Sequence, residues 1–451
     1  MMREAIFATP EMAAVFSDEA FVQRLLDVEA ALARAQARAG MIPPSAAEVI
    51  GRRCRADLFD LPALFREAAE AGTPVIPLVR RLTELVDAGA RGYVHWGATT
   101  QDIVDTAVML QMREGLDLLT ARLLALAAVG ASLAERHRRT PMAGRTMLQH
   151  AVPITFGLKA ARWLALTVRL VRRLRRARGE ALAVQLGGAA GTLAAMGPSG
   201  LRVLEGLAAE LGLAVPELPW HAERDRVIEV ASLLGMTAAA MGKIAGDLML
   251  LGQTEVGEVS AGAESAGGRS STMPQKRNPV EAITASAAAR LAVAAVPAVL
   301  AGAVQEHERA AGGWQAEWEA VPRLFRLTAS AVAWTHRALS HLEVHPERMR
   351  DNLQAAGGMI MAEALTMALA EKIGREEAYR LVQQLADRAA AAGTGLRQAA
   401  EADDRIRGIL PPPALARALE VSNYLGSAET FIDRALAAYR EIQETGPGQR
   451  S

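Results

Sequence analysis

The sequence of 451 residues contains one cysteine (Cys54), only four lysines and few aromatic residues, which make up 4% of the chain. A single cysteine cannot form an internal disulfide, so we expect a reducing compartment and a cytoplasmic protein. Lys plus Arg and Asp plus Glu both total 50, and this balance argues against nucleic acid or an acidic membrane surface as the main partner. Because nearly all the positive charge is on arginine, an anion site should combine guanidinium groups with a rare lysine.

Membrane-spanning segments and a secretory signal are not expected. The longest stretch without charge, residues 181–201, is interrupted by several glycines and by Pro198, which argues against a spanning helix. The next candidate, residues 291–305, contains Pro297 and is shorter than the roughly 18 residues that a span needs. Residues 1–5 are not a basic segment that leads into an apolar run.

Long segments rich in Ala, Leu and Val dominate the chain, whereas alternating strand patterns are scarce. This pattern predicts an all-α fold. The candidate helices are longer than the average helix of about 11 to 12 residues. They cover residues 101–138, 155–183, 224–258, 279–305 and 314–341.

Two of these segments are apolar on almost every side. Between residues 279 and 305 the only charged side chains are Glu281 and Arg290, and residues 230–254 are similarly poor in charge. A helix of this kind must be covered all round. The sequence therefore predicts a helical bundle that other subunits complete, with a large monomeric core as the alternative.

Composition changes at two places along the chain. The first long helix begins near residue 99, and the apolar helices give way to amphipathic segments between residues 343 and 351. We therefore expect an N-terminal helical domain (1–98), a central long-helix bundle with a loop at 260–278 (99–346) and a C-terminal helical domain (347–451).

One segment interrupts the helical pattern, because residues 260–278 form a Gly/Ser-rich connection between two apolar helices. A connection this long in a compact core is either a functional lid or a disordered linker. Asn278 is a good N-cap, Pro279 suits the first helical position, and Glu281 stands three residues after the cap. Such a helix N-terminus attracts anions, and this favours the lid.

Lys276 lies directly before this helix N-terminus, and the hydroxyl groups of Ser270 and Ser271 lie on the same loop. An ammonium group, an amide and hydroxyl groups then converge on one place. The pattern predicts an anion-binding lid with a candidate proton-transfer serine. The alternative is that the segment is an ordinary Ser/Gly loop.

Residues 270–279, with the pattern Ser-Ser-x-Met-Pro-x-Lys-x-Asn-Pro, resemble the signature loop of the fumarase/aspartase superfamily. Residues 95–102 and 144–153 resemble that superfamily's other active-site regions. The resemblance spans nearly the whole chain and implies an all-α, three-domain fold with a central bundle of long helices. The segments most similar to one branch, the bacterial 3-carboxy-cis,cis-muconate cycloisomerases, are residues 26–35, 185–193, 219–221 and 306–318.

The resemblance implies proton transfer at a carbon next to a carboxylate, through an enediolate that positive charge and hydrogen-bond donors must stabilise. Ser270 matches the superfamily's proton-transfer residue, and Lys276 and Asn278 match its donors. The positions that match substrate-binding residues are His95, Thr99, Thr100, Gln101, Arg145, Thr146, Gln149, Ser271, Met273 and Arg309.

Some of these positions also have structural interpretations. Thr99 or Thr100 suits the N-cap of the helix that follows, and a lone histidine such as His95 is more often structural. Glu306 and Glu308 stand close to Arg309 in the sequence, so an ion pair is as reasonable for it as a substrate carboxylate.

The superfamily's usual acid/base histidine, which follows Gly-Arg-Thr, is replaced here by Met147, and His150 has the wrong spacing to take its place. A second departure is Gln275, where many relatives have histidine. The loss of the first histidine suits the cycloisomerases. The expected activity is therefore an isomerase reaction, the closure of 3-carboxy-cis,cis-muconate to 4-carboxymuconolactone in aromatic (protocatechuate, β-ketoadipate) catabolism, with no metal and no organic cofactor.

The alternatives are adenylosuccinate lyase, another C–O or C–N lyase of the superfamily, or a non-catalytic helical scaffold. Retention of Ser270, Lys276 and Asn278 together argues against the scaffold. The resemblance also implies a homotetramer whose sites are each assembled from three subunits, which agrees with the need to cover the apolar helices. The only other expected partner is a small tricarboxylate substrate.

Overall fold

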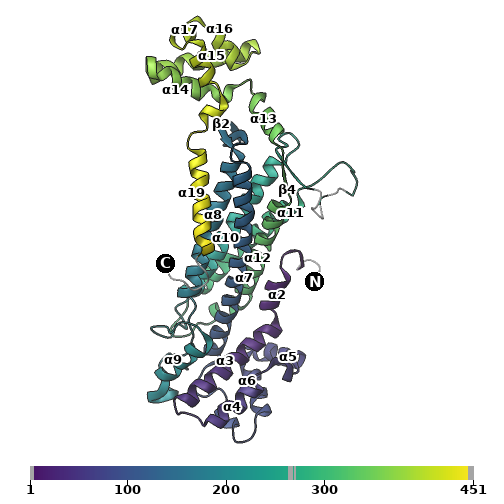
Figure 1. Cartoon of the computed structure of the whole chain (residues 1–451). Helices are drawn as coiled ribbons and strands as arrows, with labels where there is room; N and C mark the ends of the chain where they lie inside the picture. The colour runs from purple at the N-terminus through teal and green to yellow at the C-terminus, as the bar shows by residue number, and fades with distance from the viewer. Residues whose placement is uncertain (1–4, 263–267, 269–270, 445–451) are drawn as a thin grey trace. The chain divides into compact units, whose positions relative to one another are not determined.

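The computed structural model describes residues 5–262, 268 and 271–444 of the chain (Figure 1). The chain divides into two compact units, each built from three stretches of sequence. Unit 1 contains Met1–Arg122, Leu170–Gly242 and Thr284–Ala333, and unit 2 contains Leu123–Arg169, Lys243–Ile283 and Trp334–Ser451. The division into domains 1–98, 99–346 and 347–451 stays a prediction.

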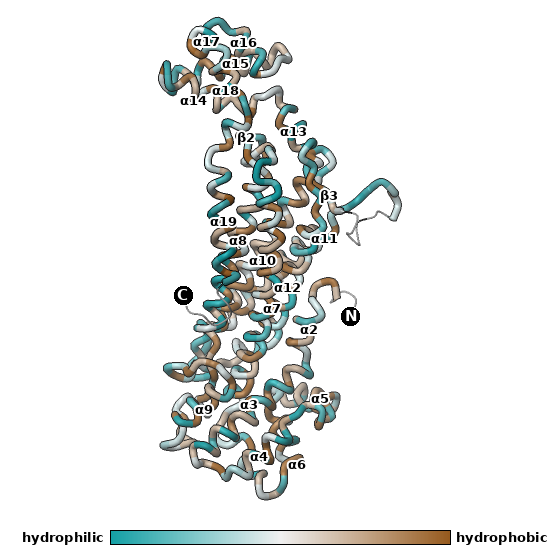
Figure 2. The backbone as a smooth tube through the Cα atoms, in the orientation of Figure 1, coloured by the Kyte–Doolittle hydropathy of each residue, from teal (hydrophilic) through white to brown (hydrophobic). Residues whose placement is uncertain are grey.

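Five long helices confirm the prediction of an all-α fold built on long helices. They are α7 (Thr100–Arg136), α8 (Phe156–Glu180), α10 (Asp225–Leu251), α11 (Val280–Gly302) and α12 (Gly313–Ser340). Figure 2 shows mainly white to brown colouring along α10, in line with its low content of charge. This helix ends at Leu251 instead of residue 258, because Gly252 follows and the chain then turns through Gly257, whose φ is +60°.

Short helices around α3 form the first part of unit 1. They are α2 (Pro10–Val15), α3 (Asp18–Arg38), α4 (Pro44–Arg53), α5 (Leu61–Ala71) and α6 (Val75–Leu85), with the 3-10 helices η1 (Ala56–Leu58) and η2 (Arg91–Tyr93). Ser17 caps α3, because its side chain accepts a hydrogen bond from the Ala20 N–H. Along α3, Leu25 and Leu26 are completely buried, and each such burial contributes about 1.5–3 kcal/mol to stability.

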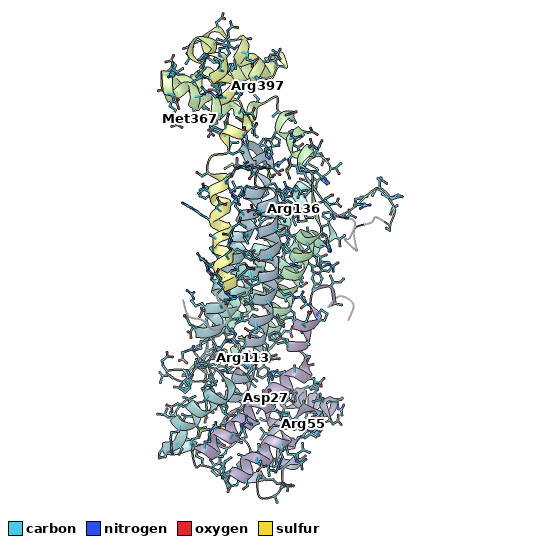
Figure 3. All side chains as sticks on the ribbon, viewed as in Figure 1. Asp27, Arg55, Arg113, Arg136, Met367 and Arg397 are labelled. Atoms are coloured by element: carbon cyan, nitrogen blue, oxygen red, sulfur yellow. The ribbon has the colours of Figure 1, made fainter. Side chains whose placement is uncertain are left out.

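The C-terminal end of α9 (Gly200–Leu211), which follows η3 (Ala194–Ser199), is capped from α7. Gly212 ends α9 in the left-handed conformation, with φ of +61°, where glycine is favoured. Arg113, labelled in Figure 3, donates from Nη1 to the carbonyl oxygens of Leu211 at 2.5 Å and Gly212 at 3.2 Å. Because a cation at a helix C-terminus also interacts favourably with the helix dipole, this contact stabilises the packing of α9.

Unit 2 contains two short antiparallel strand pairs that the sequence patterns did not predict. They are β1 (Pro141–Thr146) with β2 (Gln149–Thr155), and β3 (Val259–Ala261) with β4 (Leu342–Val344). The register of the first pair shifts between Ala143 and Arg145. A Cβ on the intervening Gly144 would lie 2.6 Å from the carbonyl oxygen of Val152, so this irregularity requires glycine.

The C-terminal helices of unit 2 surround a core of their own. They are α13 (Pro346–Ala355), α14 (Ala362–Ile373), α15 (Arg375–Ala392), α16 (Leu396–Ala402), α17 (Asp404–Ile409) and α18 (Pro412–Ala418), with η4 (Met359–Met361) and η5 (Val421–Tyr424). The last helix of the chain, α19 (Ala428–Glu444), follows them. Helix α14 packs against α15. Leu365, Leu369 and Leu396 are completely buried in this core.

By length and composition alone, three helices of the described residues, α7, α10 and α11, could cross a membrane. The first turns of α7, however, carry Asp102 and Asp105, which are buried and hydrogen-bonded within unit 1. Buried carboxylates with protein partners are typical of a core helix.

Candidate active site

The predicted site residues fall into two groups, one in each unit. Unit 1 holds His95, Thr99, Thr100, Gln101 and Arg309, and unit 2 holds Arg145, Thr146, Gln149, Ser271, Met273, Lys276 and Asn278. Ser270, the predicted proton-transfer serine, lies outside the described residues.

Thr99, Gln101 and Arg309 meet at the start of α7. Arg309 donates from Nη1 to Oγ1 of Thr99 at 2.6 Å and, over a long 3.4 Å, from Nε to Oε1 of Gln101. Thr99 stands directly before α7, and its N–H donates to the Asp102 carboxylate at 3.0 Å, as in a capping box. Thr100 is the first residue of the helix. Thr99 therefore combines the position of an N-cap with a hydroxyl group that binds Arg309.

Arg309 is bound by neutral groups and not by its acidic neighbours. Glu306 accepts a hydrogen bond from the Ala311 N–H at 3.2 Å, and across the residues that the structure describes Arg309 forms no ion pair with either flanking glutamate. A guanidinium group has five N–H donors, of which Thr99 and Gln101 occupy two. Arg309 is half-buried, and its other N–H donors suit a ligand carboxylate.

His95, on the segment that leads into α7, pairs with a buried carboxylate. Its Nδ1 lies 2.6 Å from Oε1 of Glu29 on α3, whose side chain is 1% exposed. Burial opposes the charged form of His95, but the charge and the hydrogen bond of Glu29 outweigh burial and raise the pKa of His95, with a further contribution from Asp102. The contact with Glu29 ties the segment that leads to Thr99 and Gln101 to α3.

In unit 2, Arg145 forms a bidentate ion pair with Glu258. The Nη1–Oε2 and Nη2–Oε1 distances are 2.9 and 2.7 Å. Glu258 is completely buried and also accepts a hydrogen bond from Nδ2 of Asn352 at 2.8 Å. Because the guanidinium group of Arg145 is committed to a buried carboxylate, a substrate would compete with Glu258, and substrate binding by Arg145 stays a prediction.

The tip of the β1–β2 hairpin is exposed. Thr146 and Gln149 pair across it, and the two turn residues between them, Met147 and Leu148, have φ values of +49° and +65°. Two-residue hairpins of this type need positive φ at both positions, which is strained for residues other than glycine. Met147 is 97% exposed and Leu148 75%, so a strained turn presents two apolar side chains to its surroundings.

The described part of the signature segment folds back toward the start of α11. The Asn278 N–H donates to the carbonyl oxygen of Gly268 at 2.7 Å, and the Lys276 N–H donates to that of Met273 at 3.0 Å. Gly268 has a φ of +101°, and a Cβ there would collide with the Asn278 carbonyl oxygen, so the approach requires glycine. The side chains of Ser271, Met273 and Lys276 are exposed and are therefore accessible to a ligand.

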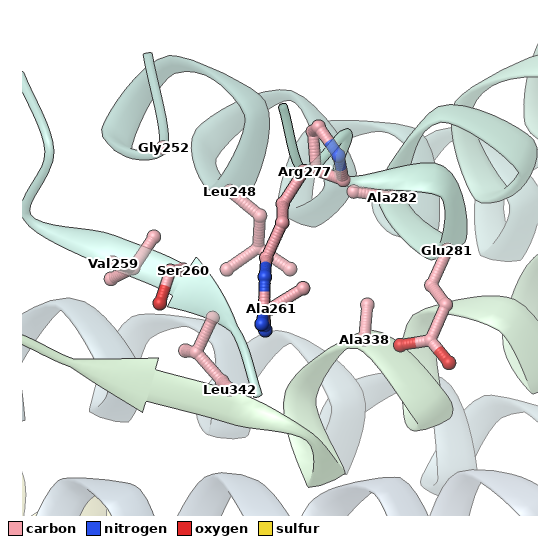
Figure 4. A pocket seen from close by; sticks show the side chains of 11 residues that line it. Leu248, Gly252, Val259, Ser260, Ala261, Arg277, Glu281, Ala282, Ala338 and Leu342 are labelled. Carbon is pink, nitrogen blue, oxygen red and sulfur yellow. The ribbon is translucent and has the colours of Figure 1, made fainter. Parts of the chain in front are cut away.

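A small pocket of about 70 Å³ borders this segment, and Figure 4 shows the Arg277 side chain reaching into it. The carboxylate of Glu281 also borders the pocket and binds Nδ1 of His341 at 3.0 Å and Nε of Arg337 at 3.3 Å. Glu281 was predicted as an acid of the helix start, and α11 begins at Val280, one residue later than predicted. Within residues 5–262, 268 and 271–444 no three His, Cys, Asp or Glu side chains are arranged to hold a metal ion.

Residues that bind predicted site residues and were missed from the sequence include Glu29, Asp102, His221 and Glu258. Asp102 stands three residues after Thr99, and this capping-box spacing could have indicated it. The others approach from parts of the chain that lie far away in sequence, and no local pattern encodes such pairings.

Known proteins resemble this chain over nearly its whole length. A family described as Lyase matches residues 4–292, and a family described as adenylosuccinate lyase C-terminus matches residues 358–435. The chain is 47% identical over 442 residues to a 3-carboxy-cis,cis-muconate cycloisomerase of Pseudomonas aeruginosa, with 97% of this chain and 96% of the relative covered.

Two further proteins cover almost the same length. A nitrosuccinate lyase of Streptomyces davaonensis is 43% identical over 440 residues, with 95% of this chain and 92% of the relative covered. The crystal structure of the 3-carboxy-cis,cis-muconate lactonizing enzyme from Pseudomonas putida matches with a TM-score of 0.90 at 41% identity, and the match covers 98% of this chain and 99% of that one.

Proposed function

The chain belongs to the fumarase/aspartase superfamily of lyases, and from this premise we propose that it is a 3-carboxy-cis,cis-muconate cycloisomerase that forms 4-carboxymuconolactone. The observation that carries the proposal is Met147, an exposed thioether at the tip of the β1–β2 hairpin, where the superfamily usually has an acid/base histidine. A thioether cannot transfer a proton. Lactone closure tolerates this loss, because the attacking carboxylate is already ionised and needs no base. The 47% identity to the P. aeruginosa cycloisomerase supports the proposal.

The chain is thus an enzyme of a soluble lyase family, and α7, α10 and α11 are core helices of that fold and not membrane spans. We place it in the cytoplasm, where it would act in aromatic catabolism. Its one cysteine, Cys54, is a buried free thiol, which agrees with a reducing compartment.

In the proposed reaction, one carboxylate oxygen of the substrate adds to a diene carbon, and a proton is added to the carbon next to another carboxylate. One C–O bond and one C–H bond form and one C=C bond is lost. The added proton comes from solvent and no other co-reactant is needed, so the product, counted as the free acid, is an isomer of the substrate. Before protonation, negative charge collects on that carboxylate as an enediolate. Lys276, Asn278 and Arg309 would stabilise this charge, and Ser270 would take part in the proton transfer.

An ultraviolet assay of 3-carboxy-cis,cis-muconate loss tests the proposal, with adenylosuccinate and nitrosuccinate run in parallel. We expect conversion of the muconate alone, with 4-carboxymuconolactone as the product by mass spectrometry or NMR. Turnover of only one of the succinates would replace the cycloisomerase with another lyase activity of the superfamily. A chain that converts none of the three would support the scaffold alternative.

We also propose that the enzyme is a homotetramer with sites shared between subunits. Helix α11 has only Glu281 and Arg290 as charged residues, yet apolar side chains along it are exposed in the single chain. They are Ile283 (46%), Leu291 (39%), Val293 (44%) and Leu300 (43%). An apolar helix that its own chain leaves partly uncovered is the pattern of a subunit interface, and the exposed Met147–Leu148 turn needs cover in the same way.

Dilution should therefore lower specific activity and helicity in parallel, because separated subunits lose both shared sites and the cover of their apolar helices. Light scattering, circular dichroism and activity measured over the same concentration series provide the test. A monomer that keeps full activity and helicity would contradict both the tetramer and the shared sites.

A further inference from the structure

Thr99, Gln101 and Arg309 lie on a closed ring of hydrogen bonds that Asp102 and His221 complete. Arg309 binds Thr99 Oγ1 (2.6 Å), and the Thr99 N–H binds Asp102 Oδ2 (3.0 Å). Asp102 Oδ1 binds His221 Nε2 (2.7 Å), and the His221 carbonyl oxygen accepts from Gln101 Nε2 (2.8 Å). Gln101 Oε1 closes the ring through Arg309 Nε (3.4 Å). Three side chains predicted to bind substrate are thus connected through two residues without an assigned role.

Asp102 is the centre of this ring. Its carboxylate is completely buried, and besides Thr99 and His221 it accepts hydrogen bonds from the backbone N–H groups of Gly187 and Gly188, both at 2.9 Å. Three backbone N–H groups and the imidazole of His221 thus surround this one carboxylate. The ring is therefore anchored to the loop at Gly187–Gly188 as well as to α7.

The packing around His221 leaves no room for it to move toward that loop. A Cβ on Gly187 would lie 2.8 Å from Cε1 of His221 and 2.7 Å from Cβ of Pro219. His221 is 3% exposed, so the imidazole is held by close packing and is aimed at Asp102. Any side chain at position 187 would collide with His221 and Pro219 unless they moved.

We infer that His221 is a positioning residue for carboxylate recognition by Arg309. Its imidazole binds Asp102, which in turn binds the Thr99 N–H, and its own carbonyl oxygen binds Gln101. One residue therefore fixes the positions of both partners of Arg309. The guanidinium group then points its unused N–H donors in one direction. This inference rests on the proposed function, in which Arg309 binds a substrate carboxylate, and a displacement of about 1 Å is enough to cost on the order of 100-fold in rate.

Two variants of His221 separate the effect of its hydrogen bond from the effect of its side-chain size. His221→Met removes the donor, whereas His221→Gln keeps an Nε2 donor at nearly the same reach. We expect His221→Met to raise KM for 3-carboxy-cis,cis-muconate by about 10- to 100-fold, as for the loss of a buried hydrogen bond to a charged group, and His221→Gln to restore most of it. His137→Met, which removes a half-buried histidine bound to Thr140 at 3.2 Å, is the matched control and should leave KM unchanged.

Hydrogen exchange tests the ring without any substrate. In His221→Met the amides of Thr99, Gly187 and Gly188 should exchange faster, and in His221→Gln they should stay protected. Unchanged exchange in His221→Met, or faster exchange with an unchanged KM, would overturn the inference. If His221→Met does not fold, Asp102→Asn is measured in the same way and should show the same faster exchange. A wild-type chain that does not convert the muconate refutes the proposed function only, because the exchange comparison still decides whether His221 holds the ring.

Discussion

Replacing Ser270 by alanine is expected to lower kcat by about 100- to 10,000-fold, the usual range for a lost acid/base group. A free serine hydroxyl transfers protons poorly, so in the proposed mechanism it depends on positive charge nearby. Lys276 and Asn278 provide that charge and a donor, and the Asn278 N–H binds the carbonyl oxygen of Gly268 at 2.7 Å, two residues before Ser270 in the sequence. The assay is the loss of ultraviolet absorption of 3-carboxy-cis,cis-muconate under saturating conditions.

Ser271→Ala is the matched comparison, because it removes a hydroxyl group from the adjacent residue of the same segment. Ser271 is predicted to bind substrate, so its loss should raise KM more than it lowers kcat. Circular dichroism should be unchanged for both variants. Near-normal kcat for Ser270→Ala, or an equal loss of kcat for both variants, would remove Ser270 from the proton transfer.

The long helices could be predicted from the sequence because their signal is local. Long stretches of Ala, Leu and Val with few breaks fix where α7, α8, α10, α11 and α12 lie, within a few residues for most ends. The end of α10 was misplaced because the predicted helix ran on through Gly252 and Gly257, which decide where the helix stops. The pairs β1–β2 and β3–β4 were missed because these short strands show no clear alternation of polar and apolar residues.

The site was less predictable, because its geometry depends on long-range contacts. Sequence motifs predicted Thr99, Gln101 and Arg309 as site residues. Their connection, however, depends on the hydrogen bond between Asp102 and His221, which are 119 positions apart in the sequence. Arg145 shows a partner that the motif did not indicate, and its predicted role in substrate binding stays a prediction. Its guanidinium group was assigned to a substrate, and the structure occupies it with the buried Glu258, a partner that no spacing in the sequence indicates.

A buried ion-pair cluster of unit 1 contacts the same site through Gln101. Arg224 donates to Asp105 at 2.8 and 3.0 Å and to Glu317 at 2.5 and 3.0 Å, and the three side chains are 2% to 6% exposed. Burial disfavours the charged guanidinium group, but the two carboxylates outweigh burial and raise the pKa of Arg224. Asp105 also accepts hydrogen bonds from Trp314 at 2.9 Å and from Gln101 at 3.2 Å.

Arg224→Met should therefore lower the free energy of unfolding by about 3–5 kcal/mol, the cost of removing one partner from a buried ion pair. The variant leaves two carboxylates in the core without their common cation, and neither can reach water. Urea unfolding at a fixed protein concentration measures the loss, because subunit association also contributes to stability. Arg52→Met is the control, since Arg52 and Glu48 form an ion pair that is 66% and 68% exposed and should contribute less than about 1 kcal/mol.

Adding Glu317→Gln to Arg224→Met should recover part of this loss, because it removes one of the two stranded negative charges. If the double variant is less stable than Arg224→Met alone, uncompensated charge is not the cause of the loss, and lost packing is. The cluster also bears on binding. Since Asp105 holds Gln101, and Gln101 binds Arg309, a double variant that regains stability should still bind substrate more weakly, with a higher KM than wild type.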